Sequence, residues 1–343
     1  MMYVVQTGRF KTLADLQDVP EGEVLSFLGE WFDEKDYVCG HTSGSTGTPK
    51  EIRLDKADMR ASARITNEFL GIGKDSVLLL CLSVSYIAGK MLVVRALEAG
   101  ATLVVCDVSS RPLERLAYTG QMDLAAMVPM QVEESLKHPE DEAKLCAIRQ
   151  LLIGGAPVSA VLEKRLQSLP VSCYATYGMT ETVSHVALRR LNVSEVYSAL
   201  GEVSFSLDNR NCLVVHAPHL QAREFVTNDL AELVDSRHFK WVGRYDHVIN
   251  SGGIKFSPEV LESKIGACIP SRYFITSLPD ERLGQRIVLV VEGERREEQE
   301  KRWLASLREV LTTYELPREI VYLSRFEETA SGKVIRRLGG SQD

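Results

Sequence analysis

The sequence is short of positive charge, of paired cysteines and of long apolar runs. Its 343 residues carry 40 Lys and Arg against 47 Asp and Glu, a formal net charge of -7. This balance excludes a nucleic-acid coat protein or a polybasic membrane anchor, because both need an excess of positive charge. The seven cysteines are scattered and form no C-x-x-C pair. They therefore favour reduced thiols in the cytosol over a disulfide framework.

The sequence also lacks a clear membrane span, an export signal and a hydrolase motif. The most apolar stretch, 77–94, is interrupted by Ser83, Ser85, Gly89 and Lys90, whereas a span needs about 20 consecutive apolar residues. The first six residues show no basic region followed by an apolar run, so we expect no signal peptide and a cytoplasmic location. No G-x-S-x-G motif is present, which leaves a serine hydrolase without support.

Apolar runs alternate with amphipathic stretches from about residue 55 to 175. Strands are predicted at Val77–Leu82, Thr102–Cys106, Leu124–Val128, Leu151–Ile153 and Val171–Ala175. Helices are predicted at Lys56–Leu70, Met91–Ala99, Pro112–Thr119 and Ser159–Leu169. This alternation indicates an α/β fold with a mostly parallel sheet that is covered on both faces. In such sheets, ligands bind beyond the carboxyl ends of the strands.

The pattern changes twice further along the chain. Short strand-like segments between residues 186 and 242 predict a β-rich subdomain. Beyond them, strands are predicted at Tyr273–Thr276, Ile287–Val291 and Glu319–Leu323, with a charged helix at Glu297–Leu311. About a hundred residues of this kind suffice for a small α+β domain. We therefore expect a large domain over residues 1–243 and a small, mobile domain over 244–343.

A glycine- and hydroxyl-rich loop is the most informative stretch of the sequence. Its candidate anion-binding residues are Thr42, Ser43, Gly44, Ser45, Thr46, Gly47 and Lys50. The glycines let backbone N–H groups approach an anion, and the lysine supplies a point charge for phosphate. The order differs from a Walker A motif, because no glycine precedes Lys50. A polar surface turn is the alternative interpretation.

This loop resembles the signature loop of the adenylate-forming superfamily, which includes acyl-CoA synthetases, adenylation domains of peptide synthetases and luciferases. The resemblance implies that the loop holds the β- and γ-phosphates of ATP. Glu51 stands where the family usually has glycine. The resemblance extends from about residue 40 to the end, and far fewer residues precede the loop here than in the family.

Further motifs follow in the family's order, and their roles are those that the resemblance implies. Tyr177 would lie against adenine, Thr180 near the phosphates, and Glu181 would bind Mg²⁺. The backbone of Gly154, Gly155 and Ala156 would line the adenine and acyl pocket, and Asp229 would accept hydrogen bonds from the ribose. Arg244 would contact ribose or phosphate, Asp246 would be the pivot between the domains, and Gly252 and Gly253 would line a pantetheine tunnel. Lys333, within Thr329–Arg337, resembles the terminal catalytic lysine, although Glu327 replaces a usual proline.

The chemistry that the resemblance implies is activation of a carboxylate in two steps. The acid would attack ATP, form an acyl-adenylate and release pyrophosphate, with Lys333 bridging the carboxylate and the α-phosphate. Two anions must be held in line, so positioning and charge stabilisation would dominate catalysis. Rotation of the small domain about Asp246 would then admit coenzyme A, and the thiol would expel AMP.

The segment Tyr177–Val186 is most similar to O-succinylbenzoate–CoA ligases of menaquinone biosynthesis. Ser184 and His185 would then face the aromatic dicarboxylate, although ordinary strand packing also explains a histidine there. Tyr86 stands where the family often has a histidine that gates the acyl pocket. Two alternatives remain: an adenylation enzyme that loads a carrier protein, and a non-catalytic nucleotide-binding relative. The expected partners are small molecules, with a homodimer left open and no nucleic acid.

Overall fold

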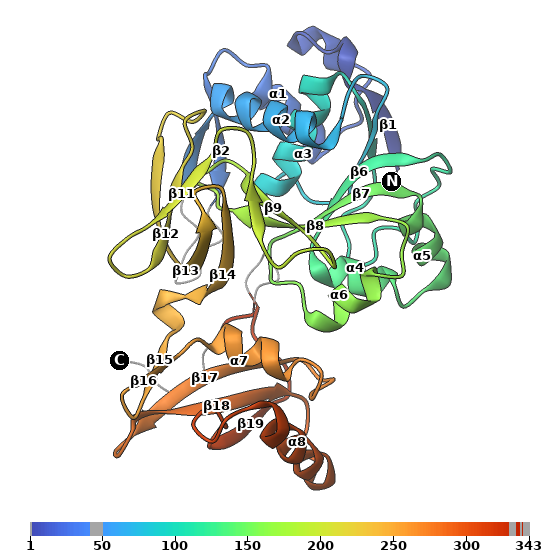
Figure 1. Cartoon of the computed structure of the whole chain (residues 1–343). Helices are drawn as coiled ribbons and strands as arrows, with labels where there is room; N and C mark the ends of the chain where they lie inside the picture. The colour runs from blue at the N-terminus through green and yellow to red at the C-terminus, as the bar shows by residue number, and fades with distance from the viewer. Residues whose placement is uncertain (1, 42–50, 329–333, 337, 339–343) are drawn as a thin grey trace.

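The computed structural model describes residues 2–41, 51–328, 334–336 and 338 (Figure 1). The predicted phosphate loop from Thr42 to Lys50 and the predicted catalytic Lys333 lie outside the described residues. None of the helices among the described residues combines the length and the apolar composition of a membrane span.

One large sheet organises the first 244 residues. In spatial order its described strands are β1 (Tyr3–Gln6), β5 (Thr102–Val105), β4 (Val77–Leu80), β6 (Met122–Met127), β7 (Ile148–Ile153), β8 (Ser172–Gly178), β9 (His185–Arg190), β10 (Tyr197–Ala199), β14 (His238–Arg244), β13 (Glu224–Asp235), β12 (Cys212–His216) and β11 (Ser204–Leu207). Strands β5, β4, β6, β7 and β8 are parallel. The pairs from β8 to β11 are antiparallel, as is β1 against β5.

Alternate side chains of the parallel strands belong to two separate cores. On β4, Leu78 and Leu80 belong to the core that also contains residues of α1 (Glu23–Trp31), α2 (Lys56–Leu70) and α3 (Ile87–Ala99). Leu79 belongs to the core on the side of α4 (Pro129–Ser135), α5 (Pro139–Cys146) and α6 (Ala160–Leu166). Helices therefore cover both faces of the parallel sheet, as Figure 1 shows, and this confirms the predicted architecture.

Helix α2 shows why some predicted boundaries are correct to the residue. The Asp55 carboxylate accepts hydrogen bonds from the backbone N–H groups of Ala57 (2.7 Å) and Asp58 (3.2 Å) at the start of the helix. Gly71 ends it in the left-handed region, with φ of 64°. Both are strong local signals, an N-cap carboxylate and a glycine after the last turn.

The predicted helix at Pro112–Thr119 is wrong. The chain forms two successive turns instead, in which Glu114 N donates to Arg111 O and Leu116 N donates to Leu113 O. Leu113 and Leu116 are both buried. The two turns bury both leucines, so the apolar spacing that predicted a helix is satisfied without one.

Two smaller sheets complete the described part of the chain. Strands β2 (Tyr37–His41) and β3 (Glu51–Asp55), which precede and follow residues 42–50 in the sequence, form an antiparallel pair. The other small sheet joins β16 (Ile254–Phe256), β15 (Ile249–Ser251), β18 (Gly284–Glu292), β17 (Tyr273–Asp280) and β19 (Glu319–Leu323). Its core includes residues of α7 (Pro258–Ile265) and α8 (Glu297–Val310). Short 3₁₀ turns occur at Thr7–Arg9, Leu13–Leu16 and Tyr245–His247.

The fold class is confirmed: an α/β part with a mostly parallel sheet and a β-rich extension precedes a small α+β part. The last strand of the large sheet, β14, ends at Arg244, and the first strand of the small sheet, β15, begins at Ile249. A division between residues 243 and 244, and the mobility of the small part, remain predictions.

Candidate functional site

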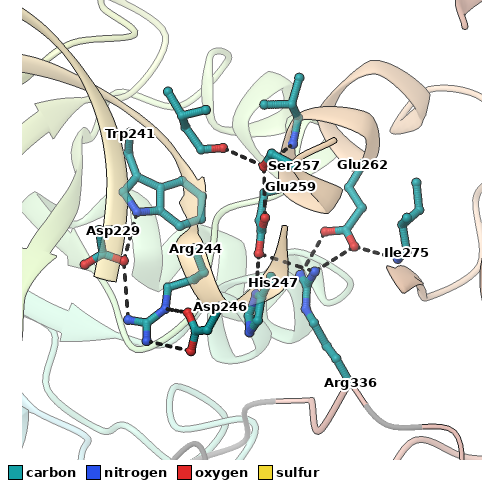
Figure 2. Close-up of polar contacts among 12 residues, drawn as sticks. Asp229, Trp241, Arg244, Asp246, His247, Ser257, Glu259, Glu262, Ile275 and Arg336 are labelled. Carbon is teal, nitrogen blue, oxygen red and sulfur yellow. Dashed lines mark hydrogen bonds and ion pairs between the residues drawn. The ribbon is translucent and has the colours of Figure 1, made fainter. Parts of the chain in front are cut away.

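The predicted ribose-binding carboxylate lies at the centre of a group of hydrogen-bond donors. The Tyr177 hydroxyl donates to Asp229 Oδ2 at 2.8 Å. Trp241 Nε1 and Arg244 Nη1 donate to Asp229 Oδ1 at 3.3 and 3.4 Å, and Figure 2 shows both contacts. Asp229 and Arg244 are register partners on β13 and β14. The antiparallel part of the sheet thus places together three motifs that are far apart in the sequence.

Tyr177 is a buried phenol and not an exposed aromatic surface. Its ring packs edge-to-face on Phe239, with centroids 5.0 Å apart, and its exposed fraction is 9%. Burial and the negative charge of Asp229 raise the pKa of Tyr177 well above its ordinary value. The hydroxyl therefore remains a donor at neutral pH. Contact between this ring and adenine remains a prediction.

The turn after β8 places Thr180 and Glu181 at the carboxyl end of that strand. Thr182 is fully buried, and its hydroxyl is within 3.0 Å of both backbone polar atoms of Met179. At Gly178, a Cβ atom would lie 2.4 Å from Ser184 O, so a larger residue does not fit without movement. The turn thus closes tightly on itself and leaves Glu181 exposed.

Another predicted segment lies at the same edge of the parallel sheet. Gly154 follows β7, the neighbour of β8, and its N–H donates to Met127 O at 3.2 Å. A Cβ atom at Gly154 would lie 2.2 Å from Thr176 Oγ1, and Gly155 has φ of 83°. Only glycine allows this close approach and this conformation without strain. Gly154, Gly155 and Ala156 therefore lie where a parallel sheet binds ligands.

A buried arginine lies beside the two predicted acyl-site residues. Arg95, on α3, is 2% exposed, and its Nη2 donates to Ser184 Oγ at 2.5 Å. Its Nε is buried without a partner in the described part of the chain, as is Oδ1 of Asn67. Burial lowers the pKa of Arg95 to about 9, so the guanidinium stays protonated at neutral pH.

His185 lies next to this arginine. A hydrogen bond of 3.0 Å joins His185 Nε2 and Thr66 Oγ1. Burial, followed by the charge of Arg95, lowers the pKa of His185 well below its ordinary value. The imidazole is therefore neutral at physiological pH, and the positive charge beside Ser184 and His185 belongs to Arg95.

Arg95 is not among the residues predicted from the sequence. The available signal was a lone arginine inside the apolar run Met91–Ala96 of a predicted helix, because arginine is rarely buried without a partner.

Tyr86 lies at the start of α3. The chain before it is tightly folded, since a Cβ atom at Gly89 would lie 2.2 Å from Ser83 O. Tyr86 O accepts the N–H of Lys90 at 3.1 Å. The side chain of Tyr86 is half-buried, and its role in gating an acyl pocket remains a prediction.

The predicted pivot carries a charged pair. Arg244 Nε and Nη2 donate to the two carboxylate oxygens of Asp246 at 3.0 and 3.2 Å. Burial alone would raise the pKa of Asp246, but the hydrogen bonds and charge of Arg244 lower it. Beyond the pivot, Gly252 and Gly253 have φ of 61° and 83°. They form the hairpin turn between β15 and β16, for which two positive φ angles are typical.

The acidic side chains of the site can contribute only part of a metal's coordination. Among the described residues, no group of three or more His, Cys, Asp or Glu could hold a metal ion. Mg²⁺ is commonly held by one or two carboxylates together with substrate phosphates. An exposed Glu181 fits that arrangement.

Comparisons with known proteins agree on one family. The model of the AMP-binding enzyme family matches residues 6–222. The probable 2-succinylbenzoate–CoA ligase of Mycobacterium tuberculosis is 30% identical over 285 residues, which cover 77% of this chain and 73% of that protein. The 2-succinylbenzoate–CoA ligase of Lactococcus lactis is 24% identical over 335 residues, which cover 91% of this chain and 72% of that protein.

Solved structures show the same fold. An acyl-CoA synthetase (AMP-forming)/AMP-acid ligase II-like protein from Dyadobacter fermentans is 34% identical, with a TM-score of 0.67 and 98% of each chain covered. The o-succinylbenzoate CoA synthetase of Bacillus subtilis, in complex with its acyl-adenylate intermediate, is 20% identical. Its TM-score is 0.75, and the match covers 89% of this chain and 69% of that one.

Proposed function

Because this chain belongs to the AMP-binding enzyme family, we propose that it is an ATP-dependent acid–CoA ligase whose acid is O-succinylbenzoate. The reaction has two steps. A carboxylate oxygen attacks the α-phosphorus of ATP, which gives acyl-AMP and pyrophosphate. The thiol of coenzyme A then attacks the acyl carbon and expels AMP.

The described residues support nucleotide binding through Asp229. A carboxylate offers about four lone-pair sites, and three donors occupy this one: Tyr177, Trp241 and Arg244. A site thus remains for a ribose hydroxyl, and the same donors keep the carboxylate oriented. Arg244 also pairs with Asp246 and can exchange that partner for ribose or phosphate. Bound Mg²⁺ would neutralise charge on the phosphates beside Glu181.

The buried positive charge of Arg95 supports O-succinylbenzoate as the acid. A buried guanidinium is costly unless a carboxylate pairs with it, and among the described residues the side chain of Arg95 hydrogen-bonds to the Ser184 hydroxyl and to no carboxylate. O-succinylbenzoate has two carboxylates, one on the aromatic ring and one at the end of the aliphatic chain. The ring carboxylate would pair with Arg95 while the aliphatic one reacts at the α-phosphate. His185, which is neutral, adds no competing charge.

The names of the relatives support the same choice. The proteins of Mycobacterium tuberculosis and Lactococcus lactis are both named as ligases of this acid.

The test is a panel of carboxylic acids with ATP and coenzyme A, in which pyrophosphate and thioester are scored separately. We expect O-succinylbenzoate to give both products at the highest kcat/KM. Pyrophosphate without thioester would instead indicate that a carrier protein accepts the acyl group. No acid-dependent pyrophosphate from any acid would refute the proposal and leave a non-catalytic nucleotide-binding protein.

A further inference from the structure

The segments on either side of residues 329–333 pair with each other. Glu328 and Val334 form an antiparallel bridge, and Ile335 N donates to Glu327 O at 2.8 Å. These two flanking segments, 326–328 and 334–336, belong to the described residues. They are the points at which the stretch that contains Lys333 joins the small α+β part.

Ion pairs connect both flanking segments to the small α+β part. Arg336 makes a bidentate pair with Glu262 of α7, with Nη1–Oε1 and Nη2–Oε2 distances of 2.8 Å. On the other side, Arg272 pairs with Glu328. The Arg336 and Glu262 side chains are 23% and 16% exposed. A planar, bidentate and largely buried pair fixes direction as well as distance.

Arg336 also contacts a second carboxylate, that of Glu259 on α7, which in turn contacts a residue next to the large sheet (Figure 2). Its Nη1 lies 3.6 Å from Glu259 Oε1. The same oxygen lies 2.6 Å from Nδ1 of His247, directly after the predicted pivot. The other oxygen of Glu259 accepts from Ser257 Oγ at 3.0 Å.

Ser257 lies against the end of the large sheet. Its Oγ is 3.1 Å from Val242 O of β14. A Cβ atom at Gly243 would lie 2.4 Å from that Oγ and 2.6 Å from the Glu259 carboxylate. A continuous series of polar contacts therefore runs from Arg336 through Glu259 and Ser257 to β14.

We propose that Arg336 is a positioning residue for adenylation: it anchors residues 334–336, which directly follow Lys333 in the chain, to α7 and, through Glu259 and Ser257, to β14. This inference rests on the proposed function, in which Lys333 acts only in the first step. A charged group that must bridge two anions has to be placed closely, because a misplacement of about 1 Å can lower a rate about 100-fold. The thiol step does not use Lys333 and should not depend on this placement.

The experiment compares the two half-reactions in full-length variants. Adenylation is followed as acid-dependent pyrophosphate release, and thioester formation is followed from chemically prepared acyl-AMP with coenzyme A. For Arg336→Gln we expect adenylation to fall about 100-fold, while the thiol step stays within about threefold. Glu262→Gln should show the same split. The matched control is Arg325→Gln, which removes an exposed arginine and should alter neither step.

The double variant tests whether the two residues act as one unit. If they do, Arg336→Gln with Glu262→Gln should lose no more adenylation than either single change, because coupled partners are not additive. Equal loss in both half-reactions would mean a merely structural role and would overturn the proposal, and so would an unchanged adenylation rate. The thiol step measured on the same preparation reports whether the variant is folded. Absence of acid-dependent pyrophosphate in the unmodified protein would instead refute the proposed function itself.

Discussion

Replacing Arg95 by glutamine removes a buried positive charge beside Ser184, one of the predicted acyl-site residues. The guanidinium is 2% exposed, so a bound carboxylate would pair with it away from water. Truncating one partner of such a buried, hydrogen-bonded charge pair costs about 2–5 kcal/mol. Taking about 3 kcal/mol, Arg95→Gln should lower kcat/KM for O-succinylbenzoate roughly 150-fold. The ring carboxylate lies away from the reacting centre, so we expect most of the loss as a higher KM.

The assay pairs this variant with an acid that lacks the ring carboxylate. Pyrophosphate release is measured with O-succinylbenzoate and with 4-oxo-4-phenylbutanoate, which retains the reacting carboxylate and the ketone. For the second acid, Arg95→Gln should stay within about threefold of the unmodified protein, because no charge pair is lost. Arg64→Gln is the control, since Arg64 lies on the neighbouring helix α2, pairs with Glu98 and is 68% exposed.

The folded state should tolerate the change. Arg95 is a buried charge without a carboxylate partner in the described part of the chain, and removing such a charge is often neutral or stabilising. The thermal midpoint should therefore be unchanged or higher. An equal fall in kcat/KM for both acids, or no fall for either, would refute the assignment of Arg95 to the second carboxylate.

Three further changes test other parts of the site. Asp229→Asn keeps the shape but removes the acceptor charge; since hydrogen bonds to charged groups contribute about 1.5–3 kcal/mol, KM for ATP should rise at least about 10-fold in the pyrophosphate assay. Gly178→Ala places a Cβ atom 2.4 Å from Ser184 O and should lower the free energy of unfolding in urea by about 1–3 kcal/mol, whereas Gly29→Ala, with nothing within 4 Å, should not. The folded pKa of His185 is depressed below 6.5, so the unfolded chain takes up the proton first. Stability should then fall as the pH drops below about 6.5, by at most about 1.4 kcal/mol per pH unit, and His185→Gln should reduce that slope.

The parallel core could be predicted because burial on both faces leaves continuous apolar runs. The helix Lys56–Leu70 matches the predicted bounds, and so does the strand Glu319–Leu323 of the small sheet. The strands of the parallel sheet differ from their predicted bounds by up to three residues at their ends. The helix predicted at Pro112–Thr119 is wrong because the same spacing of leucines also lets two successive turns bury both side chains.

The site could be predicted only where its residues stand together in the sequence. Tyr177 and Asp229 belong to recognisable motifs, but their hydrogen bond joins residues 52 positions apart. Arg95 and Ser184 are 89 positions apart, and Arg336 and Glu262 are 74 apart. Periodicity reports local structure, so it cannot show which distant charges meet. Such pairs depend on strand order and on how α7 packs, which only the folded chain reveals.

Helix α1 shows how much a short segment near the start of the chain contributes to this arrangement. Its Glu30 accepts a hydrogen bond from Cys39 N at 2.6 Å, on the strand that leads into residues 42–50, and pairs with Lys90 of α3 at 3.5 Å. Its Glu23 accepts from Ser83 Oγ at 2.6 Å, in the turn before α3. Glu23 and Glu30 are seven residues apart and therefore lie on one side of the helix. One nine-residue helix thus holds both chain segments that enter the predicted phosphate and acyl sites.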